Sequence, residues 1–131
     1  MTWTPTDKEV ELLTTAVSDK RYEYFIHKVA DQEQVWSLRD AEGWRVVADS
    51  LDRECVPLWP HKAYAELYAT DVFAGSHPEP IPLDTFMTKW LPGMAQDGRF
   101  AAVFPTPSNK GVVVAPMELH LHLAAEMEKY K

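Results

Sequence analysis

The run Trp59-Pro60-His61-Lys62 holds the residues best suited to binding a small anion. Proline is well tolerated as the first helical residue, because its missing N–H would have no partner there. A helix that begins at Pro60 places His61 and Lys62 in its first turn, where free backbone N–H groups favour anions. Arg53 lies shortly before this run as a further cation. The pattern predicts a carboxylate or phosphate site built from Trp59, His61, Lys62 and Arg53. The alternative is that Trp59 packs in the core, His61 stays neutral and Lys62 extends into water.

Catalytic chemistry has less support. A nucleophilic Cys55 would need His61 as its base and a third group to orient that base, and the spacing matches no known arrangement. A lone cysteine on a strand is more often a small core residue. His120 and His122 lie two positions apart on a predicted helix, so their rings point to opposite sides and do not share a metal ion. We therefore predict no catalytic residue, no metal ligand and no cofactor.

Two further groups of residues suggest binding to another protein. Trp36 and Trp44 flank a predicted hairpin that also carries several acids. Both indoles are expected to pack in the core, but an indole left exposed beside these acids would mark an interaction patch. Lys110 lies in the segment PTPSNKG, which is either a rigid recognition loop or a stiffened hairpin turn. The candidate interaction residues are Trp36, Trp44 and Lys110.

Periodicity predicts the elements that must hold these residues. Thr6 and Glu9 form a capping box for a helix over residues 7–17, and further helices are expected at 20–31 and after Pro60, Leu83 and Pro116. Strands are expected at 35–40, 44–49, 55–59, 99–104 and 111–115, with a loop at 71–80. Pro57 should place its strand at a sheet edge or a bulge, and Pro92 should kink or split its helix. These elements predict a single α+β domain over residues 1–131. It would have one mainly antiparallel sheet of about five strands, namely two hairpins plus an edge strand, packed with about five helices.

Composition excludes several classes of protein. The chain has 131 residues, of which 46% are hydrophobic, so it can bury a core without disulfides. Its formal net charge of −7 makes broad binding to nucleic acid or to an anionic membrane surface unfavourable. We expect no signal peptide, because MTWTPTDKEV has neither a basic start nor an apolar stretch, and no apolar run is long enough to span a bilayer.

Several motifs together resemble a known family. They are Trp59-Pro60-His61, Trp90-Leu91-Pro92-Gly93, Asp97-Gly98, and Phe104-Pro105-x-Pro107 leading to Lys110-Gly111. The chain from Tyr22 to Tyr130 resembles a family of small bacterial proteins catalogued as domain-of-unknown-function family 2750. The resemblance implies a bacterial, cytoplasmic, stand-alone domain. It implies no activity, so it assigns no catalytic residue.

Three functions follow as hypotheses. The first is an interaction module whose acidic, aromatic surface binds a basic protein, because the chain is acidic and shows no catalytic signature. The second is an enzyme or a binder of small anions at the Trp59-Pro60-His61-Lys62 corner. The third is a homo-oligomeric structural protein that pairs through an uncovered sheet edge or face.

Overall fold

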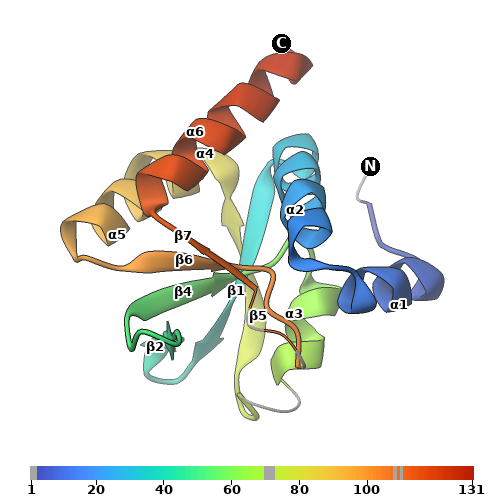
Figure 1. Ribbon diagram of the computed structural model, residues 1–131, viewed down its shortest axis with the longest axis horizontal. Coiled ribbons are helices and arrows are strands. Elements are labelled where there is room, and N and C mark those ends of the chain that lie inside the picture. The colour runs from blue at the N-terminus through green and yellow to red at the C-terminus, as the bar shows by residue number, and fades with distance from the viewer. Residues whose placement is uncertain (1–2, 70–72, 108, 110) are drawn as a thin grey trace.

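The computed structural model describes residues 3–69, 73–107, 109 and 111–131. Its helices, labelled in Figure 1, are α1 (Asp7–Thr15), α2 (Ser18–Gln32), α3 (Lys62–Ala69), α4 (Leu83–Thr85), α5 (Leu91–Gln96) and α6 (Pro116–Met127). A π-helical turn, η1 (Phe86–Trp90), joins α4 to α5, and a 3-10 turn, η2 (Glu128–Tyr130), follows α6. The strands are β1 (Gln34–Asp40), β2 (Gly43–Trp44), β3 (Val47–Ala48), β4 (Glu54–Leu58), β5 (His77–Pro82), β6 (Phe100–Val103) and β7 (Val112–Val114). The expected α+β class is confirmed.

The strands form two sheets, so the expected single sheet of about five strands is wrong in its layout. One sheet has the order β2-β1-β5 and the other has the order β3-β4-β6-β7. All the pairings are antiparallel except that of β4 with β6. The predicted hairpin over 99–104 and 111–115 is present as β6 and β7.

The first predicted hairpin divides between the two sheets. Trp44 pairs with Arg39 of β1, whereas Val47 pairs with Cys55 of β4. The segment 44–49 was expected to be one strand because its apolar residues alternate. In the structure β2 ends at Trp44, the Arg45 N–H makes one more hydrogen bond to β1 at the Leu38 carbonyl (2.9 Å), and the chain enters the other sheet at Val47.

Prolines lie in two of the strands, β4 and β5, and each strand tolerates them for a different reason. Pro57 lies in β4, which is an interior strand and not the expected edge strand. It is tolerated because the pairing with β3 ends at Cys55, and beyond that point the Pro57 carbonyl accepts a hydrogen bond from Ser37 Oγ at 2.7 Å. Within the loop expected at 71–80, residues 71 and 72 lie outside the described part, and His77 begins β5. The prolines of β5 alternate along an edge strand, so they leave the paired side of its backbone intact: Pro78, Pro80 and Pro82.

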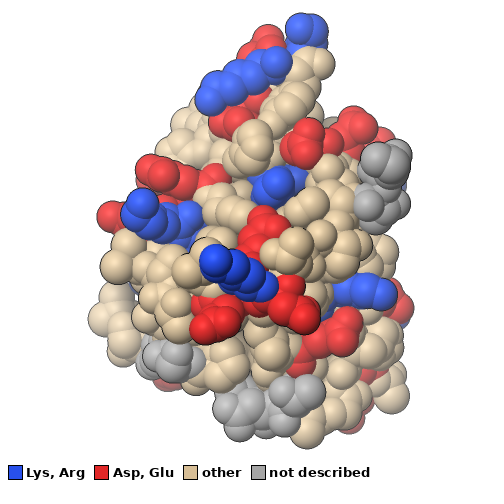
Figure 2. Space-filling view, turned by 90° about the vertical axis from the view of Figure 1, so that its right-hand side faces the viewer, with Lys and Arg blue, Asp and Glu red and all other residues tan. Residues whose placement is uncertain are grey.

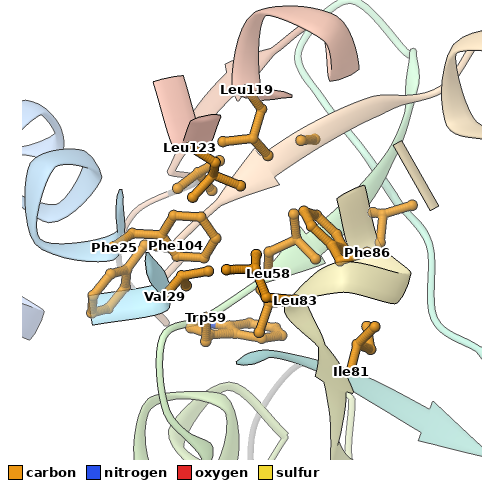
Figure 3. Packing of buried hydrophobic residues seen from close by; sticks show 14 of the residues in the cluster. Phe25, Val29, Leu58, Trp59, Ile81, Leu83, Phe86, Phe104, Leu119 and Leu123 are labelled. Atoms are coloured by element: carbon orange, nitrogen blue, oxygen red, sulfur yellow. The ribbon is translucent and has the colours of Figure 1, made fainter. Parts of the chain in front are cut away.

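Trp59 connects the two sheets. Its backbone N–H donates to the Trp36 carbonyl and its carbonyl accepts from the Trp36 N–H, each at 2.9 Å. Its side chain is fully buried, and Nε1 donates to the Pro105 carbonyl at 2.7 Å. Figure 3 shows Trp59 below a core to which both sheets and the helices α2 and α6 contribute, including Phe25, Val29, Leu58, Phe104, Leu119 and Leu123.

The helix around Pro92 shows how the chain accommodates a proline. Proline lacks an N–H and its ring collides with the carbonyl four residues earlier in a regular helix. The preceding turn widens into η1, where the Leu91 N–H donates to the Phe86 carbonyl. The expected kink or split at Pro92 therefore takes the form of a π-helical turn. Trp90 is the last residue of this turn, and its ring lies against that of Trp44.

The remaining helices pack around these sheets. In Figure 1, α6 lies above β6 and β7 with α2 beside it, and α1 lies at the periphery near α3. Helix α6 begins at Pro116 as expected. None of the helices in the described part of the chain combines the length and the apolar character needed to traverse a bilayer.

We predict that Arg21 is required for stability. Its guanidinium is buried and donates to the carbonyls of Phe104 and Ala16, at 3.1 and 2.5 Å, and to Ser18 Oγ at 3.2 Å. Replacing Arg21 with Met leaves these acceptors unpaired and should lower the free energy of unfolding by about 2–4 kcal/mol. Arg21→Lys should also be destabilising, because an ammonium cannot reproduce the planar fork. Urea denaturation measures both. A loss below about 0.5 kcal/mol in each variant would contradict the prediction.

Candidate functional site

His61 caps a helix in the structure. Helix α3 begins at Lys62 and not at Pro60, and His61 Nδ1 accepts the backbone N–H of Ala63 at 3.0 Å. The imidazole is only 4% exposed and lies against the rings of Trp3 and Trp36, with centroids at 5.2 and 6.1 Å. Burial lowers the pKa of His61, and Lys62 lowers it further, although Glu66 and Glu9 oppose these effects. Because Nδ1 accepts a hydrogen bond and the pKa is lowered, we infer that the His61 ring is neutral.

The other predicted anion ligands lie apart from His61. Trp59 is fully buried, whereas Lys62 is exposed. Arg53 precedes β4 and therefore lies at the end of that strand opposite to His61. Its guanidinium pairs with Asp49 at 2.6 Å and stacks 4.4 Å from the centroid of the Phe100 ring. The structure does not bring the four predicted residues together.

The remaining reactive side chains also lie apart. Cys55 is fully buried in β4, and burial raises the pKa of its thiol. His120 is half-buried, and exposed His122 contacts the Tyr22 hydroxyl through Nδ1 at 2.5 Å. Within the described ranges, no group of three or more His, Cys, Asp or Glu side chains is arranged to hold a metal ion.

A cleft of about 350 Å³ lies beside the crossing from β2 to β3, and we call it the Trp44–Trp90 cleft. The hairpin end, strand β4 and the η1–α5 segment form its walls. Its lining residues are Trp44, Arg45, Val46, Val56, Lys89, Trp90, Gly93, Met94, Asp97 and Arg99. Val56 and Met94 are almost completely buried and supply an apolar floor.

Two perpendicular indoles form the aromatic part of this cleft. The rings of Trp44 and Trp90 lie with centroids 4.8 Å apart and planes at 84°. A tight turn fixes Trp44, because Asp40 Oδ1 accepts the Glu42 N–H at 2.9 Å and Gly43 adopts a φ of 130°, which favours glycine. Both indoles are half-buried, so part of each remains available to a ligand.

Three cationic side chains reach the cleft from separate elements. Arg45 pairs with Asp40 at 2.6 Å, and its Nε is buried without a hydrogen-bond partner. Arg99 pairs with Glu54 at 3.1 Å, and Lys89 is exposed. The Glu42 N–H and then the Arg45 guanidinium lower the pKa of the Asp40 carboxyl, while burial opposes them. The ion pairs thus orient Arg45 and Arg99, and the Arg45 guanidinium also lies 4.5 Å from the centroid of the Phe73 ring.

Comparison with protein families identifies the chain. The model of the family described as "Protein of unknown function (DUF2750)" matches residues 22–123, which is most of the chain. The chain belongs to the DUF2750 family. No curated protein and no solved structure matches it.

Several residues of the motifs that resemble DUF2750 line the Trp44–Trp90 cleft. Trp90, Gly93 and Asp97 come from two of these motifs, and together they occupy one side of the cleft. A Cβ added at Gly93 would meet nothing within 4 Å, so this position borders open space. Trp44 is the predicted interaction residue that lies here; Trp36 lies against His61, and Lys110 is outside the described residues. Sequence reasoning missed Arg45, Lys89 and Arg99, because their convergence depends on tertiary structure.

The lowered pKa of His61 predicts a pH dependence of stability. Below its unfolded pKa of about 6.5 the unfolded chain takes up a proton at His61 that the folded chain resists, so folding free energy is lost as pH falls. His61→Asn keeps an acceptor for the Ala63 N–H but cannot titrate. Urea denaturation between pH 7.5 and 5 should therefore show a steeper loss in the native sequence than in His61→Asn, approaching about 1 kcal/mol per pH unit. Equal slopes would show that His61 titrates normally.

Proposed function

We propose that this DUF2750 protein binds a small organic anion with a flat apolar group in the Trp44–Trp90 cleft. The observation that carries the proposal is the convergence of three cations, two perpendicular indoles and an apolar floor on one cleft. The volume of about 350 Å³ lies at the lower end of the range of pockets for small ligands, about 300–1,000 Å³. A compact ligand therefore fits better than a polymer.

Each wall of the cleft supports a part of that ligand. The half-buried faces of Trp44 and Trp90 favour a flat apolar group, which would cover indole surface now in contact with water. Lys89 has an exposed ammonium for a carboxylate or phosphate, and Arg45 and Arg99 add guanidinium donors. Among the lining residues that the structure describes, Asp97 is the one carboxylate, so cations exceed acids by two (three minus one). Their ion-pair partners Asp40 and Glu54 cancel this excess, so the anion would be held by directed donors, with the exposed Lys89 ammonium first among them, and not by a net positive charge.

The lining favours recognition over catalysis. Among the described lining residues there is no serine, cysteine or histidine, so the cleft offers no pair of nucleophile and imidazole base. Its cations and indoles instead supply charge-assisted hydrogen bonds and stacking, which are interactions that select a ligand.

Titration with phenyl phosphate tests the proposal. We expect saturable binding by calorimetry, weakened about three- to tenfold in Lys89→Gln because one charge-assisted contact is lost. Gly93→Leu should also weaken binding, since its side chain would extend into the open space at the rim. Lys62→Gln is the matched control, because Lys62 lies at the His61 corner and not at the cleft.

Two outcomes would contradict this function. One is the absence of saturable binding of phenyl phosphate by the native sequence. The other is an equal loss in Lys62→Gln and Lys89→Gln, which would show that the anion responds to overall charge and not to this cleft.

The other hypotheses stay predictions. A basic protein partner is supported by the net charge of −7, although Figure 2 shows acids and cations interspersed on the face that it presents. A homo-oligomer would be detected by light scattering at several concentrations. The bacterial, cytoplasmic setting implied by the family resemblance also stays a prediction.

A further inference from the structure

Trp3 contacts residues that are not part of the Trp44–Trp90 cleft. Four residues form what we call the Trp3 pocket, namely Tyr24, Lys28, Gln32 and His61. The indole meets the edges of His61 and Tyr24, with centroids at 5.2 and 6.0 Å, and the Lys28 ammonium lies 4.6 Å from its centroid. The backbone N–H of Trp3 donates to Gln32 Oε1 at 3.2 Å. The pocket therefore contacts both an aromatic ring and the main chain that carries it.

The walls of this pocket are fixed by contacts that do not involve Trp3. The Tyr24 and Tyr64 hydroxyls lie 2.9 Å apart, and His61 Nδ1 is held by the Ala63 N–H. Helix α2, which carries the other wall residues, is anchored by the fully buried Phe25 and Val29. The Tyr24–Tyr64 and His61–Ala63 contacts do not depend on the Trp3 side chain.

The segment that carries Trp3 is attached much less firmly. Within residues 3–15 only Pro5 is buried, and α1 contributes no buried residue, so its contact with the core is made by the partly buried Val10 and Leu13. Leu12 is 58% exposed, and the Tyr24 hydroxyl donates to Glu9 Oε2 at 2.6 Å as a link between α1 and α2. The segment lies at the side of the molecule in Figure 1, outside the residues 22–123 that match the family. Elements with little buried surface open at low free-energy cost.

We propose that the Trp3 pocket is a binding site for a large aromatic side chain of an extended peptide segment in a partner protein, and that Trp3 is its intramolecular occupant. Gln32 would accept the backbone N–H of the incoming residue, as it now accepts that of Trp3. Lys28 and the ring edges of His61 and Tyr24 would hold the side chain. A tethered occupant has an effective concentration in the millimolar range, so the partner binds only by displacing it.

Peptide titration of the full chain tests this inference. The probe is an acetylated peptide with the sequence of residues 1–9, MTWTPTDKE, and its control has alanine in place of the tryptophan. We expect calorimetry to show saturable binding of the tryptophan peptide to the Trp3→Ala chain. Wild type should bind it at least tenfold more weakly, because Trp3 competes. Adding Lys28→Ala should reduce the affinity of the Trp3→Ala chain about threefold.

A second variant keeps the test independent of Trp3→Ala. Glu9→Ala removes the bond between α1 and Tyr24 but leaves Trp3 in place, so it should bind the peptide more tightly than wild type does. The inference is overturned if neither variant shows saturable binding, if the alanine peptide binds as well, or if wild type and Trp3→Ala bind the tryptophan peptide equally. None of these readouts involves phenyl phosphate. Peptide binding at the Trp3 pocket and anion binding at the Trp44–Trp90 cleft can therefore succeed or fail independently.

Discussion

The paired hydrogen bonds between Trp36 and Trp59 hold the two sheets together. They join β1 to the end of β4, and the buried Trp59 side chain extends the junction by donating to the Pro105 carbonyl. Two residues later the chain reaches His61, which caps α3. Because one indole links both sheets to the segment after β6, the position of His61 follows from core packing. The corner that carries it is consequently dry, and its imidazole serves the helix.

The division into two sheets also bears on the Trp44–Trp90 cleft, because the segment that passes from one sheet to the other lines it. The Arg45 N–H still donates to the Leu38 carbonyl of β1 at 2.9 Å, and two residues later Val47 pairs with Cys55 in the sheet of β4. The π-helical turn before Pro92 then presents Trp90 to Trp44. A regular helix would place the residues after Phe86 at different angles, since the wider turn changes the rotation per residue. The Trp44–Trp90 cleft thus depends on a proline in a helix and on a strand that changes sheets.

The sequence predicted the features that depend on neighbouring residues. The Thr6 cap, the hairpin of β6 and β7, and the start of α6 at Pro116 are set by local chemistry, and all are present. Features that depend on distant partners were missed. The prolines of β5 indicated a loop because their tolerance depends on lying at an edge, and the split of residues 44–49 depends on where β4 lies. The cations of the cleft come from three separate parts of the chain, so no pattern of residue spacing predicts that they converge.

Exposure sets the buried Trp59 apart from the other four tryptophans, which composition could only count. Trp59 is fully buried, and an indole with no exposed surface cannot exchange its contacts for those of a ligand. Trp3, Trp44 and Trp90 are half-buried, and Trp3 and Trp44 each lie near a cation, Lys28 and Arg39 respectively. A half-buried ring already has its geometry fixed on one side and still has surface to cover on the other. The surface that a ligand could still cover therefore lies at the margins of this fold, where half-buried indoles meet cations, and not at the fully buried Trp59.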